Sequence, residues 1–147
     1  MSTEYSNEFN TLLGGEISAV ETYDLAITKR KFDSQTLESL NACRASHADR
    51  VAKLTKCAAE TGGSASTTSG VWGTFAALVQ DSASSSHDAL ALLEECEAER
   101  LMQYETQKEI APAIVKEVIV TDLLPAQHET HLIVSALLRT STPAPVN

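Results

Sequence analysis

The stretch GGEISAVETYDLAI, residues 14–27, has the apolar spacing of a helix that is buried along one face. Leu13, Val20 and Ile27 recur every seven residues, and at about 100° per residue they form one stripe. Glu16 lies near the middle of that stripe, so its carboxylate is predicted to face the protein core. Because a buried carboxylate without a partner is strongly unfavourable, we expect the rest of the chain to supply a partner.

Three further segments show the same periodicity, and the sequence therefore predicts an all-α fold, a four-helix bundle. Asp33 or Ser34 is the predicted N-cap of the second helix, and Gly62 with Gly63 is predicted to end it. Pro125 falls inside the fourth helix and should kink it or split it, because proline lacks the backbone N–H. The predicted helices cover residues 7–31, 34–60, 84–109 and 112–138.

The lengths of the connections predict how the helices are joined. Short links make antiparallel hairpins of the first and second helices and of the third and fourth, whereas the middle connection is nearly as long as a helix. A long crossover of this kind is typical of ferritin-like bundles. Within it, residues 71–80 (VWGTFAALVQ) predict a short extra helix whose Trp72 and Phe75 plug one end of the bundle. We assign residues 1–140 to one domain and residues 141–147 to a flexible, proline-rich tail.

The net charge, the apolar runs and the cysteines of the chain indicate which partners and which compartment to expect. The chain has 147 residues and a net charge of −9, which argues against nucleic acid and against anionic membrane surfaces as partners. No apolar run approaches the ~18 residues of a membrane span. Three cysteines without a Cys-x-x-Cys pair indicate reduced thiols, so we expect a cytoplasmic protein. A homodimer is one association that small bundles often form, and the sequence leaves it open.

A shift of 81 positions aligns polar residues of the two hairpins and suggests an internal repeat. The matched pairs are Glu16 with Glu97, Tyr23 with Tyr104, and His47 with His128. Helical spacing places the members of these pairs on inward faces, one carboxylate or imidazole per helix, and His131 shares a face with His128. Each tyrosine is two turns from its glutamate, and its hydroxyl is expected to hydrogen-bond either the carboxylate of the opposite hairpin or a bound water.

Three interpretations of these groups stay open. In the first, Glu16, Glu97, His47, His128 and His131 hold one divalent cation, because carboxylates and imidazoles are ligands for Fe, Mn or Zn. In the second, the carboxylates form buried ion pairs and hydrogen bonds without a metal, with Arg44 as the cation. Exposure of the glutamates at the rim of the bundle is the third alternative.

The chain resembles the ferritin-like superfamily, and within it a bacterial family of four-helix proteins of unknown function. The resemblance rests on GEISAVETY, SHADRVAKL followed by TGG, SGVWGTF, LLEECEAERLMQYE, and Gln127 with the histidines after it. It implies carboxylate ligands at Glu16 and Glu97 and histidine ligands at His47 and His128. Di-iron members of the superfamily carry a Glu three residues before each histidine, whereas this chain has Arg44 and Pro125 there.

Arg44 and Pro125, which stand where di-iron proteins have glutamates, limit the functions that the resemblance implies. Without the two bridging carboxylates a di-iron oxidase site is incomplete, so the sequence does not predict an enzyme. One hypothesis is a bundle that binds a single metal ion, with stress-related or redox-related duties implied only by the resemblance. The second is a metal-free structural or interaction protein. The third is a small dimeric helical adaptor that works through its surface.

Overall fold

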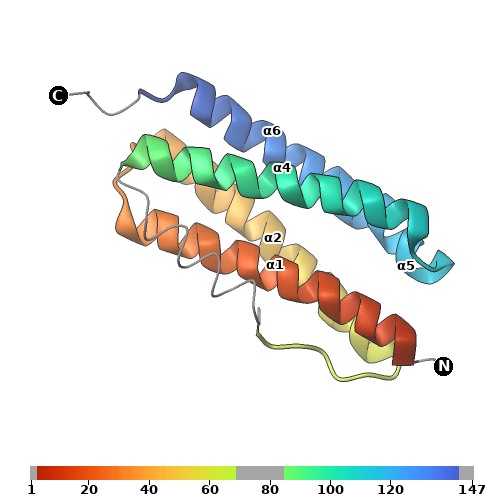
Figure 1. Cartoon of the computed structure of the whole chain (residues 1–147). Coiled ribbons are helices and arrows are strands. Elements are labelled where there is room, and N and C mark those ends of the chain that lie inside the picture. The colour runs from red at the N-terminus through yellow and green to blue at the C-terminus, as the bar shows by residue number, and fades with distance from the viewer. Residues whose placement is uncertain (1–2, 69–84, 143–147) are drawn as a thin grey trace.

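The computed structural model describes residues 3–68 and 85–142, and all the regular structure in these ranges is helical. The predicted helix at residues 71–80, with Trp72 and Phe75, lies outside the described residues, as does most of the predicted tail. Figure 1 shows two helical hairpins packed together, α1 with α2 and α4 with α6. The elements are α1 (Thr3–Lys29), α2 (Ser34–Glu60), α4 (Ser86–Ile110), α5 (Ala113–Val118), η1 (Ile119–Leu123) and α6 (Leu124–Thr140).

The ends of α2 form where the sequence predicts them, whereas α1 begins four residues before the predicted start and ends two residues before the predicted end. The Asp33 carboxylate accepts a 2.7 Å hydrogen bond from the Thr36 amide and caps α2. Gly62, just beyond the other end of α2, has a φ of +88°, a left-handed conformation that favours glycine. The Ser85 hydroxyl caps α4 by accepting from the Asp88 amide at 3.1 Å. The all-α bundle and the second helix's bounds are therefore confirmed.

The long middle connection joins opposite ends of the bundle. Where it begins, Asn10 of α1 donates to the Ser64 carbonyl at 2.9 Å. Where it finishes, the Ser86 hydroxyl donates to the Lys31 carbonyl, at the other end of α1, at 2.6 Å. As a result α4 runs antiparallel to α1 and parallel to α2 (Figure 1).

The fourth predicted helix is divided into α5, the π-helical turn η1 and α6. Pro125, the second residue of α6, cannot donate a backbone hydrogen bond, and the amide of Leu124 bonds to the Ile119 carbonyl five residues earlier. The wider turn holds residues four apart on one face, so Ile119, Leu123 and Gln127 are all buried. Splitting at Pro125 was predicted, but the π-helical turn was not.

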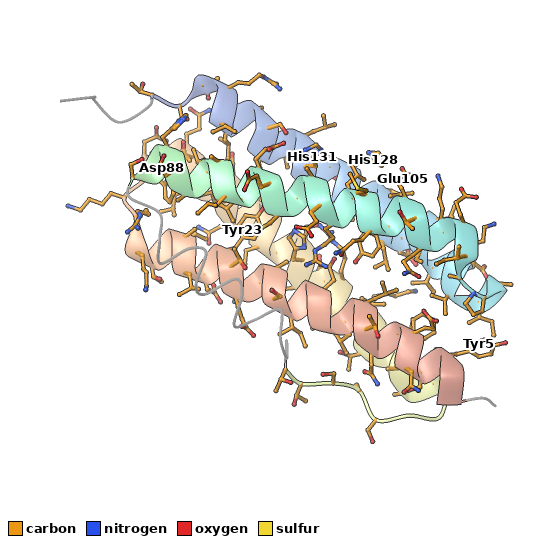
Figure 2. The ribbon with its side chains drawn as sticks, viewed as in Figure 1. Tyr5, Tyr23, Asp88, Glu105, His128 and His131 are labelled. Carbon is orange, nitrogen blue, oxygen red and sulfur yellow. The ribbon has the colours of Figure 1, made fainter. Side chains whose placement is uncertain are left out.

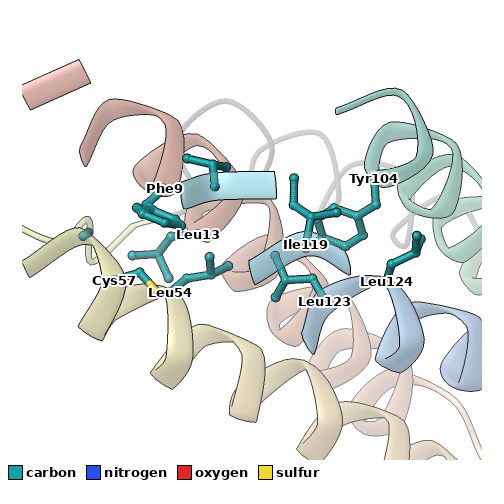
Figure 3. Packing of buried hydrophobic residues seen from close by; sticks show 10 residues of the cluster. Phe9, Leu13, Leu54, Cys57, Tyr104, Ile119, Leu123 and Leu124 are labelled. Atoms are coloured by element: carbon teal, nitrogen blue, oxygen red, sulfur yellow. The ribbon is translucent and has the colours of Figure 1, made fainter. Parts of the chain in front are cut away.

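Two apolar clusters fill the bundle, one toward each end. Figure 3 shows the first, in which Phe9 and Leu13 of α1 meet Ile119 and Leu123 of η1. The second gathers Tyr23, Leu40, Cys43, Leu90, Leu93 and Val134 around the other half of the bundle. Between these clusters every long helix contributes buried polar side chains, and this polar layer is the candidate site. None of the helices in the described ranges is both long and apolar enough to cross a membrane.

Candidate functional site

Four helices contribute to the polar layer: α1, α2 and α4 near their midpoints and α6 near its start. Glu16 lies on α1, His47 on α2 and Glu97 on α4, each no more than 3% exposed. The predicted inward placement of these three side chains is confirmed. The layer is completed by residues that the sequence analysis did not assign to the core, namely Arg50 of α2 with Gln127 and Thr130 of α6.

His47 bridges the carboxylates of the two hairpins. Its Nδ1 lies 2.6 Å from Glu16 Oε2 and its Nε2 lies 2.8 Å from Glu97 Oε2. An ionised carboxylate can only accept hydrogen bonds, so each ring nitrogen must carry a proton to make both contacts. Only the protonated imidazolium has two N–H groups, and the geometry therefore fits a positively charged His47.

Two tyrosines cross between the hairpins and complete the carboxylate contacts. Tyr23 of α1 donates its hydroxyl to Glu97 Oε2 at 2.5 Å, and Tyr104 of α4 donates to Glu16 Oε1 at 2.5 Å. Of the two predicted partners, the glutamate of the opposite hairpin is therefore the one that each tyrosine contacts. Each glutamate of one hairpin is bound by groups from both hairpins.

Arg50 extends the layer from α2 to α6. Its Nη1 lies 3.4 Å from Glu16 Oε1 and also donates to Gln127 Oε1. Its Nη2 donates to the Thr130 hydroxyl at 3.1 Å. Gln127 and Thr130 in turn donate to Glu97 Oε1 at 2.7 and 2.8 Å, so the polar groups of α6 connect Arg50 to Glu97.

Two predicted metal ligands, His128 and His131, lie away from this layer. His128 has a 53% exposed side chain 3.5 Å from Glu105, and His131 bonds to Glu94 at 2.9 Å on the same side of the α4–α6 hairpin. Figure 2 shows His128 and His131 with Glu105 along this hairpin, and Tyr23 apart from them. Their predicted inward placement is wrong because Gln127 and Thr130 lie on the buried face of α6. Each histidine directly follows one of these residues, so its side chain is turned about 100° around the helix from that residue.

Arg44 does not neutralise the core carboxylates. Its guanidinium makes a salt bridge to Asp24 of α1 at 2.5 Å, with both side chains more than a third exposed. On the helical wheel Arg44 and Arg50 fall about 60° to either side of His47, and only Arg50 turns toward α6. The predicted buried cation exists, but it is Arg50.

The electrostatics of the layer favour charged forms despite its burial. Burial raises the pKa of Glu16, but attraction to His47 and Arg50 outweighs it and holds that pKa well below the ordinary value. Burial also disfavours the charged imidazolium, but Glu16 and Glu97 raise the His47 pKa above its usual range. For Glu97 the effect of burial is outweighed by His47, Tyr23 and Thr130, which lower its pKa.

The donor set was compared with what a metal ion requires. Among the residues described, no three His, Cys, Asp or Glu side chains are grouped so as to hold a metal ion. The two nitrogens of His47 point at different carboxylates, whereas a metal needs its ligand atoms to converge on one position. Both carboxylates are also surrounded by N–H and O–H donors. As placed, these residues form a hydrogen-bonded ion cluster and do not fit a coordination shell.

The crossed tyrosines allow a matched test of the layer. Tyr23→Phe and Tyr104→Phe each remove one hydroxyl that donates to a buried carboxylate, and we expect each to lower the free energy of unfolding by about 1.5–3 kcal/mol. Urea titration monitored by circular dichroism measures the change. Tyr5→Phe, at the end of the bundle (Figure 2), is the control and should change stability by less than about 0.5 kcal/mol. Equal effects for all three variants would contradict the assignment.

The chain was also compared with known proteins. No protein-family model, no curated protein and no solved structure matches it.

Proposed function

We propose that this protein is a metal-free member of the ferritin-like bundles that acts as a structural or interaction protein. In this proposal the buried ion cluster takes the place that a metal centre has in the enzymes of the superfamily. One observation carries it: His47 makes a hydrogen bond to a carboxylate of each hairpin, with one ring nitrogen for each. A cation that bridges both hairpins supplies the attraction that a metal ion would otherwise supply.

The ferritin-like part of the proposal is supported by topology and by the position of the carboxylates. Two antiparallel hairpins are joined by a connection between opposite ends of the bundle, as in that class. Glu16 and Glu97 occupy the first and third long helices, and His47 occupies the second. The fourth long helix contributes the neutral side chains Gln127 and Thr130 to the layer, and Pro125 stands three residues before His128, where those enzymes have an acidic residue.

Charge balance supports the metal-free part. The buried carboxylates of Glu16 and Glu97 carry two negative charges, and His47 with Arg50 carries two positive charges. Two charges of each sign already compensate one another, and a divalent cation would have to displace donors and add two more positive charges at short range. A single-metal centre is the rival function, and the following experiment separates the two.

We expect protein purified without a polyhistidine tag to contain no stoichiometric iron, manganese or zinc. Mass spectrometry of the metal content and the melting temperature with and without a chelator are the two measurements, and the chelator should leave the melting temperature unchanged. In the ¹⁵N NMR spectrum both ring nitrogens of His47 should show the shifts of protonated nitrogen. One equivalent of metal together with a chelator-induced drop in melting temperature would establish the metal centre instead.

The interaction role is favoured by the distribution of exposed apolar side chains. Every large hydrophobic residue that is strongly exposed in the described ranges lies on the second hairpin. These residues are Met102, Ile110, Ile114, Val120 and Leu132. We propose that the second hairpin makes the contacts with a partner. A second copy of the chain is one such partner, and analytical ultracentrifugation tests this association directly.

A further inference from the structure

A small cavity lies beside the ion cluster, between α1 and α4. It is lined by Ser18, Thr22 and Tyr23 of α1, by His47 of α2, and by Cys96, Glu97, Arg100 and Gln103 of α4. Its volume is about 40 Å³. Because one water needs roughly 10–15 Å³ of such space, the cavity has room for about three waters or for a ligand of three to four non-hydrogen atoms.

Arg100 brings hydrogen-bond donors to this cavity that the described residues leave unused. Its guanidinium lies directly over Gly15 of α1, where a side chain on residue 15 would collide with it. Among residues 3–68 and 85–142, no acceptor forms a hydrogen bond or salt bridge with Arg100. The neighbouring hydroxyls are used differently, since Thr22 donates to the Ser18 carbonyl at 2.7 Å and Tyr23 donates to Glu97. A guanidinium offers five N–H groups in a planar fork that matches a carboxylate.

The charges around the cavity do not cancel. His47 and Arg50 balance Glu16 and Glu97 within the ion cluster, and Arg100, which is half-buried, adds one positive charge beside it. Glu99 also lines the cavity, but this residue is exposed, so water screens its charge. One positive charge is therefore in excess beside the ion cluster, in a chain whose overall net charge is −9.

We propose that this cavity binds one small, planar, monovalent oxyanion, of the size of formate. Arg100 holds the two oxygens of the anion through paired N–H donors, and the Gln103 amide and the Cys96 thiol lie beside it. Cys96 serves as a neutral group, because burial raises the pKa of its thiol to about 11. The anion cancels the excess charge, and its three non-hydrogen atoms match the space. This inference concerns a site next to the ion cluster and goes beyond the structural role proposed above.

Formate is the probe for the test. At the highest affinity per atom known for very small ligands, an anion of three non-hydrogen atoms binds with a dissociation constant of roughly 1 mM. We expect ¹³C-formate titrations followed by NMR to show saturable binding of one formate per chain in the millimolar range. The melting temperature should rise with sodium formate relative to sodium chloride at the same ionic strength.

Two variants locate the site, and a third is the control. Arg100→Gln should weaken formate binding at least about tenfold, because the charged fork is lost. Cys96→Leu keeps every charge but fills the cavity, and it should abolish binding even if Arg100→Gln fails to fold. Arg44→Gln removes an arginine from the surface salt bridge and should leave formate binding unchanged. The proposal is overturned if the wild type shows no saturable binding, or if Cys96→Leu binds formate as the wild type does.

Discussion

Replacing His47 by alanine should destabilise the protein more than any other single substitution in the polar layer. His47→Ala leaves Glu16 and Glu97 buried, at most 3% exposed, without the cation that lies between them. Removing one partner of a buried ion pair typically costs about 3–5 kcal/mol, because the remaining charge is uncompensated. We expect a loss of that size in the free energy of unfolding at pH 6, measured by urea titration.

A triple variant separates the effect of charge from the effect of the lost side chain. His47→Ala combined with Glu16→Gln and Glu97→Gln removes the cation and both carboxylates together, so no buried charge is left unpaired at these three positions. We expect it to recover more than half of the stability lost in the single variant. Arg44→Ala, which breaks only the surface salt bridge to Asp24, should cost less than about 1 kcal/mol. A triple variant less stable than His47→Ala would contradict the charge argument.

The fold was largely predictable because local signals and long-range packing agree. Helical periodicity and the caps at Asp33 and Ser85 define the ends of α2 and the start of α4. The length of the middle connection indicated that it runs between opposite ends of the bundle. The π-helical turn η1 was not predictable by the same means, because a wheel at 100° per residue assumes an unbroken α-helix. Pro125 signalled a disturbance in the fourth helix but not its form.

The site was predictable only where the helices are regular. Glu16, His47 and Glu97 lie on unbroken helices, and the wheel placed all three inward. On the fourth helix His128 was predicted to face inward because the 81-residue shift aligns it with His47. A four-residue spacing from Ile119 through Leu123 reaches Gln127 instead, and this spacing was the available signal.

The choice between Arg44 and Arg50 depended on information that one helix does not contain. Both flank His47 at three residues and fall at equal angles on either side of it. Which of the two enters the core is set by the neighbouring helix, because α1 offers the exposed Asp24 on one side and α6 offers Gln127 and Thr130 on the other. Contacts of this kind are tertiary, so spacing within α2 could not decide between them.

Stability should pass through a maximum at mildly acidic pH, between about 4.3 and 6.5, the ordinary pKa values of Glu and His. Glu16 and Glu97 have lowered pKa values in the folded protein, so their contribution is complete above about pH 4.3 and is lost as the pH falls further. His47 has a raised pKa, so its contribution is complete below about pH 6.5 and is lost as the pH rises toward the folded value. Each pKa unit of difference corresponds to about 1.4 kcal/mol.

The His47→Ala variant shows which residues cause the loss of stability on each side of this pH maximum. Urea titrations of both proteins from acid to mildly alkaline pH, at constant ionic strength, give the free energy of unfolding at each pH. The decline above pH 6.5 that is due to His47 should be absent from the variant, so the stability difference between the two proteins should shrink as the pH rises. On the acid side the variant should lose less stability than the wild type, because Glu16 and Glu97 no longer have a cation to hold their pKa values down. A stability difference that stays constant across the whole range would mean that His47 keeps the same charge in the folded and unfolded chain, and the bridging imidazolium would then be wrong.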